Sequence, residues 1–335
     1  MRQVVIPTSL ARAPALPPAG ECLSLAGESM GTTWQVQVHA PALALEDLRT
    51  AIGETLALVV QQMSHWESGS DLSRFNAAAA GTDLVLPDPL FDLLTRAQRI
   101  SFETGGAYDA TAGELVQRWG FGPDRRRLDP GFRIPSDAEL QALRGRSGWQ
   151  RLSLDPASHT ARQPGGLALD LSAIGKGFAV DLVSQRLLDA GFVSHLVEIG
   201  GELRGAGLKP DAQPWWVALE PPAENAALEQ TLIALCDRAV ATSGDYRRCF
   251  EQDGRRYSHT IDPRTGAPVD NDLASVTVIS EECWHADALS TALTVMGMEQ
   301  GRAFADRHDI AARFVRRTPS GLSEHRSRAW GDMLL

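Results

Sequence analysis

A lysine between two glycines stands near the middle of the chain, where an apolar run meets a helical pattern. Residues 169–181 read LDLSAIGKGFAVD, and Lys176 lies between Gly175 and Gly177. A lysine and free backbone N–H groups at a helix start favour the binding of a phosphate or pyrophosphate. The two glycines let a ligand approach the main chain closely. An ordinary helix start is the alternative, because the segment is neither a complete Walker A motif nor a G-x-G-x-x-G fingerprint.

A carboxylate and a hydroxyl lie one helical turn apart further along the chain. Residues 286–293 read ADALSTAL, so Asp287 and Thr291 occupy one face of a predicted helix. Their oxygens are hard ligands of the kind that Mg²⁺ accepts together with substrate phosphates. In the alternative, Asp287 complements the helix dipole and Thr291 bonds back to its own helix.

A histidine precedes a turn in residues 257–266, YSHTIDPRTG. His259 has the side chain most often used to remove a hydroxyl proton near neutral pH, and the Asp-Pro-x-Thr-Gly turn would hold it rigidly. A purely structural histidine is the alternative. Upstream, residues 241–246 read ATSGDY, which is typical of either a strand end that lines a pocket or a plain turn.

Three further segments offer flat or soft apolar contacts suited to an aromatic ring system. Residues 105–111, GGAYDAT, follow a predicted helix and combine backbone groups with the carboxylate of Asp109. Trp66 lies in MSHWE and Met30 in GESMGTT. Aromatic and methionine side chains are more often core residues, so each segment alone is weak.

The elements that must position these residues follow from hydrophobic periodicity. Apolar residues recur at intervals of three and four over 43–63, which predicts a helix with one buried face. Further helices are predicted over 89–102, from the Gly-Lys-Gly step to Gly191, and over 285–296. Strands are predicted over 33–39, 196–199, 215–219 and 274–279.

The order of these elements favours an α+β fold with mixed or antiparallel sheets packed against helices. Residues 121–165 are predicted as loop and short hairpins. Residues 1–22 are rich in proline and alanine, so we expect an extended leader before a single compact unit over 23–335.

Composition narrows the class of protein. The 32 basic and 42 acidic residues give a net charge of −10 without a basic stripe, which argues against a nucleic-acid surface. Only two lysines occur, and one of them is Lys176. The four cysteines form no C-x-x-C pair. No run of about 20 apolar residues and no secretory h-region is visible, so we expect a cytoplasmic protein without a membrane span.

Taken in order, the segments resemble the ApbE family of FAD:protein FMN transferases over roughly residues 25 to 300. The matching stretches are GESMGTTW, MSHWESGSDLSRFN, GGAYDATAGELVQRWGFG, LDLSAIGKGFAVD, EIGGELRGAG, ATSGDYRR, YSHTIDPRTGAPV, and SVTV followed by HADALSTAL. The resemblance implies the ApbE-like α+β fold.

The resemblance also implies roles for individual residues. FAD contacts are implied for Met30, Trp66, Ala107, Tyr108, Asp109, Asp170, Lys176 and Ile261. Magnesium is implied at the Ala173 carbonyl with Asp287 and Thr291, and His259 matches a histidine proposed as the catalytic base. At position 108 tyrosine replaces the commoner phenylalanine.

The implied reaction moves the FMN half of FAD, through a phosphoester, to a threonine or serine hydroxyl of an acceptor protein and releases AMP. The implied acceptors are redox-complex subunits or FMN-carrying domains. Two alternatives stay open, a magnesium-dependent FAD pyrophosphatase that yields FMN and AMP, and an FAD-binding protein without catalysis. Many family members are exported, so a periplasmic, inner-membrane-associated location is the alternative to the cytoplasm.

Overall fold

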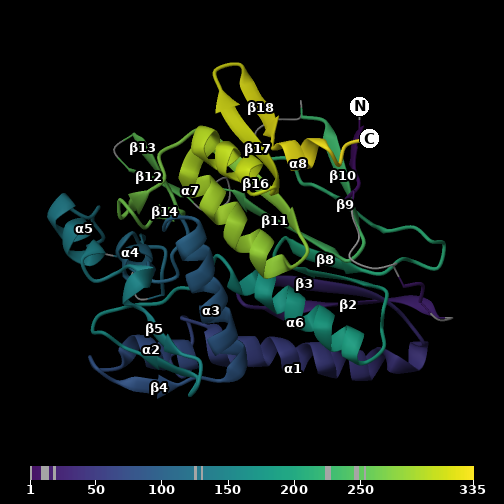
Figure 1. Ribbon diagram of the computed structural model, residues 1–335, viewed down its shortest axis with the longest axis horizontal. Helices are drawn as coiled ribbons and strands as arrows, with labels where there is room; N and C mark the ends of the chain where they lie inside the picture. Colours follow the sequence, from purple (N-terminus) through teal and green to yellow (C-terminus); the bar gives the residue numbers. More distant parts are fainter. Residues whose placement is uncertain are drawn as a thin grey trace.

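An antiparallel sheet of eight strands forms the centre of the molecule (Figure 1). The computed structural model describes residues 2–8, 15–17, 20–123, 127–129, 131–222, 228–244, 249–252 and 254–335. In spatial order the strands are β18 (Gly321–Arg326), β17 (Ala311–Thr318), β16 (Leu273–Ser280), β11 (Arg238–Gly244), β8 (Glu202–Ala206), β7 (His195–Ile199), β3 (Thr32–Ala40) and β2 (Glu21–Ser29). All neighbouring pairs run antiparallel.

Three long helices cover one face of this sheet (Figure 1). They are α1 (Leu45–Met63), α6 (Gly175–Asp189) and α7 (Cys283–Arg307). Strand β3 turns every second residue toward them, and Trp34, Val36 and Val38 belong to the main core together with Ile52 of α1 and Val180 of α6. Alternate residues of the strand are apolar, and each helix has one apolar face, so the strand and the helices bury these faces against each other.

A smaller layer covers the opposite face. It consists of the three-stranded sheet β1-β10-β9 and the short helix α8. Their bounds are β1 Arg2–Val5, β10 Gln230–Leu235, β9 Trp215–Ala218 and α8 Arg328–Gly331. Because both faces of the central sheet are covered, β16 is buried along nearly its whole length. Val278 packs against the helices and Ile279 against the smaller layer.

The remaining elements form short hairpins and helices at one end of the molecule (Figure 1). Helices α4 and α5 share a separate hydrophobic cluster with Ile261 of β14. The elements are α2 (Asp71–Ala77), α3 (Asp88–Glu103), α4 (Gly113–Arg118), α5 (Asp137–Arg144), the 3-10 turn η2 (Trp149–Arg151), and the strands β4 (Asp83–Val85), β5 (Ser153–Asp155), β6 (Thr160–Arg162), β12 (Cys249–Gln252), β13 (Arg255–Ser258), β14 (Ile261–Asp262) and β15 (Ala267–Pro268). A further 3-10 turn, η1 (Ala42–Ala44), directly precedes α1.

The α+β prediction is confirmed, and the predicted helices and strands lie within two or three residues of α1, α3, α6, β3, β7, β9 and β16. The sequence analysis missed helices α2, α4, α5 and α8 and the second half of α7. Residues 121–165 contain the predicted β5–β6 hairpin, but also α5, whose start carries a complete capping box of Ser136 and Glu139. Helix α7 breaks at Gly297, which has φ 76°, and then continues to Arg307.

The predicted leader over 1–22 includes residues 1, 9–14 and 18–19, which lie outside the described residues. Within it, β1 pairs in parallel with β10, and the Leu335 N–H donates to the Val4 carbonyl at 3.1 Å. The chain ends therefore lie side by side (Figure 1). The domain boundary at residue 23 stays a prediction, although this strand already belongs to the folded body.

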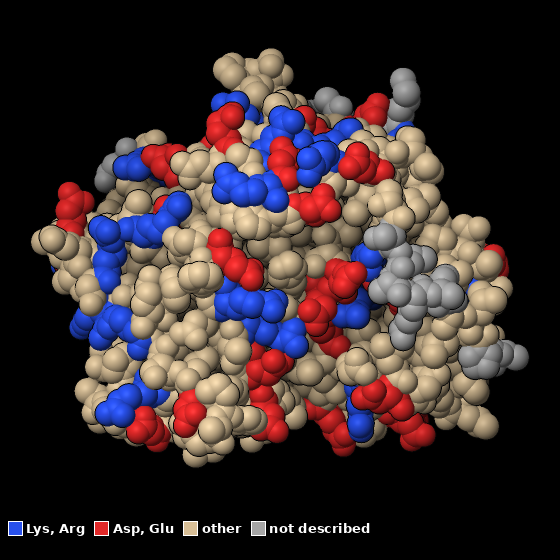
Figure 2. All heavy atoms as spheres, viewed as in Figure 1, with Lys and Arg blue, Asp and Glu red and all other residues tan. Residues whose placement is uncertain are grey.

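Across the described ranges, none of the helices is both long and apolar enough to traverse a lipid bilayer. Basic and acidic side chains are interspersed on the face seen in Figure 2. That face therefore carries no continuous basic surface.

Candidate active site

The N-terminus of α6 is held against the first turns of α7 by a direct hydrogen bond. The Gly177 N–H donates to Asp287 Oδ2 at 2.9 Å, across 110 residues of sequence. Asp181 of α6 accepts hydrogen bonds from the N–H groups of Cys283 and Trp284 at 3.0 and 2.9 Å. These bonds satisfy two of the free backbone donors at the N-terminus of α7. The predicted phosphate site and the predicted metal site therefore meet at one place in the fold.

Gly177 is required at this contact because the two helices approach too closely for a side chain. A Cβ on this residue would lie 2.4 Å from the Cys283 carbonyl oxygen and 2.8 Å from Asp287 Cβ. We expect Gly177→Ala to lower the free energy of unfolding by about 3 kcal/mol, since overpacking forces the backbone apart. Urea denaturation measures this loss.

Gly175→Ala is the matched control at the same helix start. Its Cβ would have only Leu171 Cβ nearby, at 3.9 Å, which is ordinary contact. We expect this variant to keep or slightly raise the stability, since alanine loses less backbone entropy in a helix. Equal unfolding midpoints for the two variants would contradict the close helix contact.

Lys176 pairs with one buried carboxylate and lies within electrostatic reach of a second. Its Nζ pairs with Glu202 Oε2 at 2.6 Å, and Glu202 and Asp287 are only 3% exposed. Burial alone would lower the pKa of Lys176, but the charges of Asp287 and Glu202 raise it above the usual value. Burial raises the pKa of both carboxyls, and Lys176 opposes that shift. The site thus combines a partly exposed lysine with two buried carboxylates.

Three hydroxyls, of Ser243 in β11 and of Ser290 and Thr291 in α7, form a hydrogen-bonded group at the helical turn after Asp287. Ser243 Oγ lies 2.9 Å from Thr291 Oγ1 and 2.7 Å from Ser290 Oγ. Asp287 and Thr291 share one helical face, as the sequence predicts. The predicted strand end at residues 241–244 therefore lies beside Thr291, while Asp245 and Tyr246 of the same motif lie outside the described residues.

The loop before α6 ties Ala173 and Asp170 to the segment that holds Asp109. The Asp170 N–H donates to the Ala110 carbonyl at 2.7 Å, and Asp170 Oδ1 accepts the Ser172 N–H at 2.8 Å. Ala173 is half-buried directly ahead of α6. These backbone contacts bring the predicted main-chain metal ligand and two predicted FAD contacts to the same end of α6.

Asp109 organises its own loop. Its Oδ1 accepts the N–H and hydroxyl of Thr111 at 2.8 and 2.7 Å, and its Oδ2 accepts the Trp149 N–H at 2.9 Å. Burial raises the pKa of this carboxyl, although these hydrogen bonds lower it in part. Asp109 therefore has a structural task besides its predicted contact with FAD.

Tyr108 and Ala107 are buried in the main core. The Tyr108 hydroxyl has no hydrogen-bond partner among the described residues. Burial, followed by the charges of Asp287, Asp170 and Asp109, raises the pKa of this phenol well above its usual value. The hydroxyl therefore stays neutral, and all three carboxylates act on it electrostatically.

We expect Tyr108→Phe to raise the free energy of unfolding by about 1 kcal/mol, because it removes a buried hydroxyl that makes no hydrogen bond. FAD affinity should not change, since the hydroxyl is enclosed by protein. Urea denaturation and a fluorescence titration with FAD measure the two quantities. A less stable variant would reveal that the hydroxyl has a hydrogen-bond partner.

Met30 occupies the tight turn between β2 and β3. Met30 and Gly31 have φ of 54° and 71°, as a two-residue hairpin turn requires. The neighbouring Thr32 lies against Gly200, where an added Cβ would come within 2.9 Å of Thr32 and 3.3 Å of Lys176 Cδ. The turn with Met30 therefore borders the lysine.

Trp66 lies on an exposed loop, with 52% of its surface accessible. Its ring is tilted against His65 at a centroid distance of 5.6 Å, and His65 Nδ1 is 3.8 Å from Asp170 Oδ1. The residues that follow Trp66 border an open pocket of about 410 Å³ against α1. Trp66 is therefore accessible to a ligand next to Asp170.

His259 lies at the bend between β13 and β14 and is half-buried. Its ring meets Phe121 nearly edge-on, with centroids 6.3 Å apart. Ile261 is only 6% exposed and packs in the cluster shared by α4 and α5, so any contact with FAD would use its main chain. The described contacts do not join either residue directly to Lys176 or Asp287.

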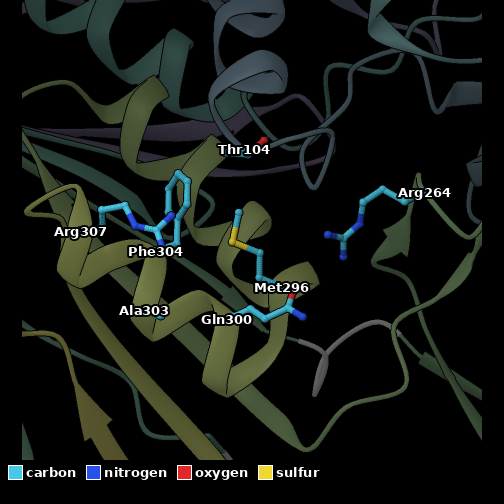
Figure 3. Close-up of a pocket in the computed structure, with 7 residues that line it drawn as sticks. All are labelled: Thr104, Arg264, Met296, Gln300, Ala303, Phe304 and Arg307. Atoms are coloured by element: carbon cyan, nitrogen blue, oxygen red, sulfur yellow. The ribbon is translucent and has the colours of Figure 1, made fainter.

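A second open pocket of about 310 Å³ adjoins the segment before Ala107 (Figure 3). Arg264 extends into it from the β14–β15 turn, and Asp262 accepts two hydrogen bonds from its guanidinium, each at 2.9 Å. No predicted site residue lines this pocket. The lining residues are Thr104, Arg264, Met296, Gln300, Ala303, Phe304 and Arg307.

The chemistry of the donor set fits magnesium better than a transition metal. The described residues contain no cluster of three or more His, Cys, Asp or Glu side chains arranged for a metal. Magnesium needs fewer protein ligands, because it is commonly bound by one or two carboxylates together with substrate phosphates and waters. Among the described contacts, hydrogen bonds to Asp287 use only Oδ2, so Oδ1 remains available on the helical face that Asp287 shares with Thr291.

The sequence interpretation missed Glu202 at this site and gave Ser243 no role of its own, since its segment is typical of either a pocket-lining strand end or a plain turn. Glu202 lies in EIGGELRGAG, which carries part of the resemblance, and Ser243 lies in ATSGDYRR. The sequence signal that could have identified Glu202 is a charged residue directly after two glycines. The pairing of Glu202 with Lys176 depends on how β8 lies against α6, and local spacing does not encode that contact.

Comparison with known proteins extends the resemblance to nearly the whole chain. The model of the ApbE family matches residues 30–314. The FAD:protein FMN transferase of Vibrio cholerae is 40% identical over 316 residues, which cover 94% of this chain and 93% of that protein. The FAD:protein FMN transferase of Salmonella typhimurium is 35% identical over 308 residues, covering 91% and 86%.

Solved structures agree with the sequence comparison. The apo form of the flavinyl transferase ApbE of Pseudomonas stutzeri superposes with a TM-score of 0.86 at 40% identity, covering 93% of this chain and 96% of that one. The flavin transferase ApbE of Vibrio cholerae gives 0.85 at 38% identity, covering 94% and 100%. Since the family match, the sequence identity and the shared fold all span most of its length, this chain belongs to the ApbE family.

Proposed function

We propose that this chain transfers the FMN half of FAD to a threonine or serine hydroxyl of an acceptor protein and releases AMP. Family membership supports the reaction, because the relatives compared above are named for it. The observation that carries the proposal here is the hydrogen bond from Gly177 to Asp287. It brings a lysine, a helix N-terminus and a candidate metal carboxylate to one place, as the cleavage of a pyrophosphate requires.

Each part of the site has a task in this reaction. Lys176 and the N-terminus of α6 attract the pyrophosphate of FAD. The turn with Met30, the segment 107–109, Asp170 and the exposed Trp66 border that place from several sides, and we assign the flavin and adenine contacts to them. The main chain at Ile261 adds one more contact.

Asp287, Thr291 and the Ala173 carbonyl would hold magnesium. When bound there, the ion would supply Lewis-acid stabilisation of charge on the pyrophosphate oxygens. The one available carboxylate oxygen and the Thr291 hydroxyl on the same helical face support this assignment.

The acceptor hydroxyl is the nucleophile. Its oxygen attacks the phosphorus on the FMN side, the bond from that phosphorus to the AMP oxygen breaks, and His259 takes the hydroxyl proton. The acceptor then carries FMN as a phosphoester, and AMP leaves with its phosphate ionised. A partly exposed histidine at the bend between β13 and β14 is accessible to a protein substrate.

Incubation with FAD, MgCl₂ and a candidate acceptor domain tests the proposal. Denaturing electrophoresis followed by fluorescence imaging should reveal flavin covalently attached to the acceptor. Release of FMN and AMP without attachment would indicate a pyrophosphatase instead, and intact FAD would indicate a binding protein. The same reaction with EDTA in place of MgCl₂ should give no attachment.

A further inference from the structure

The glutamate that pairs with Lys176 is placed by a tight turn. Gly200 and Gly201 connect β7 to β8 with φ of 62° and 100°, a conformation that favours glycine. The Gly201 N–H donates to Glu198 Oε1 at 2.7 Å, which fixes the turn. Glu202 follows as the first residue of β8, and its buried carboxylate reaches Lys176 at 2.6 Å.

Lys176 has two carboxylates within electrostatic reach, but it pairs with only one of them. Both Asp287 and Glu202 raise its pKa, yet in the described part of the chain its ammonium forms an ion pair with Glu202 and none with Asp287. The Lys176 side chain is 29% exposed, whereas both carboxylates are buried, so without Glu202 the ammonium would be attracted to the one buried carboxylate that remains.

We infer that Glu202 is a positioning residue, which holds the Lys176 ammonium toward β8 and thereby keeps Asp287 available for a divalent cation. This inference rests on the proposed function, because that function assigns the cation to Asp287. Glu202 itself touches neither the reacting atoms nor the cation. Its effect is exerted through Lys176.

The test compares cation affinity among variants of the full chain. We expect Glu202→Gln, which keeps the side-chain shape, to weaken binding of Mg²⁺ to the protein–FAD complex about tenfold or more, because Lys176 then competes at Asp287. Isothermal titration calorimetry with MgCl₂ measures this affinity. A high MgCl₂ concentration should restore most of the FMN transfer rate of Glu202→Gln. The variant therefore needs more Mg²⁺ for activity, but its rate at saturating Mg²⁺ changes little.

Two control variants separate positioning from other effects. Glu198→Gln removes a neighbouring charge that also acts on Lys176, yet the amide oxygen still accepts from Gly201 and the ion pair stays intact. Glu324→Gln disrupts a buried ion pair with Arg313 (2.7 Å) in β17 and β18, away from the site. Both should bind Mg²⁺ nearly as the unchanged protein does, and thermal unfolding reports any general loss of stability.

The inference is overturned if Glu202→Gln binds Mg²⁺ with unchanged affinity. It is also overturned if Glu198→Gln weakens binding equally, since the cause would then be overall charge. Absence of FMN transfer by the unchanged protein would refute the proposed function instead. The calorimetric comparison would still decide whether Glu202 controls the cation site.

Discussion

Replacing His259 with alanine is expected to slow FMN transfer about 100- to 10,000-fold, the usual contribution of a positioned general base. FAD affinity should stay close to that of the unchanged protein, because the pyrophosphate contacts lie on α6 and not on the β13–β14 bend. The rate is measured as covalent flavin on the acceptor over time at saturating FAD and MgCl₂. FAD affinity is measured separately by fluorescence titration.

His308→Ala is the matched control. His308 is exposed at the end of α7 and stacks on Phe304, with centroids 4.3 Å apart. Its removal should leave transfer unchanged. A normal rate for His259→Ala would remove this residue from the mechanism. An equal loss of FAD affinity and rate would instead make His259 part of the FAD site.

Replacing Asp287 with asparagine is expected to lower the transfer rate about 1,000-fold or more. A metal ligand supplies several kcal/mol of charge stabilisation in the transition state, and each 1.4 kcal/mol or so is a factor of ten. The fold should persist, because the asparagine carbonyl still accepts from Gly177 and Lys176 still pairs with Glu202. Calorimetry should detect no magnesium binding to the FAD complex of this variant.

Asp181→Asn is the control for Asp287→Asn, because it also removes the charge of a largely buried carboxylate between α6 and α7. Asp181 accepts two N–H groups at the start of α7 and pairs with Arg204, so its substitution weakens the same helix contact without touching the metal set. We expect lower stability but retained magnesium binding. Full activity of Asp287→Asn would exclude this carboxylate as the metal ligand.

Local sequence patterns predict much of the fold. The regular apolar spacing of α1 and the glycines around α6 mark these helices because such signals lie within one segment. The alternation in residues 274–279 predicts strand β16 correctly, but its polar residues do not face water. Thr277 is buried and lies 2.9 Å from Thr242 Oγ1, since the sheet is covered on both faces.

The elements that were missed had weak local signals or depend on distant partners. Helix α5 follows a segment rich in glycine, proline and arginine, which obscured the capping box at Ser136. Strand β1 lies in the proline- and alanine-rich start of the chain, and it forms a strand because β10, more than 220 residues later, lies beside it. Stabilisation of a strand by pairing with a distant strand cannot be predicted from its local sequence alone.

The sequence alone determined which residue types are available for chemistry and where the main helices begin. Lys176, Asp287, Thr291 and His259 stand out from their neighbours without any structure, and helix periodicity is a short-range property. Only the tertiary structure decided that Asp287 accepts from Gly177, that Ser243 adjoins Thr291, and that Glu202 holds the ammonium of Lys176. The physical reason is that these contacts join α6, α7, β8 and β11, whose relative positions follow from the strand order and burial of the whole sheet.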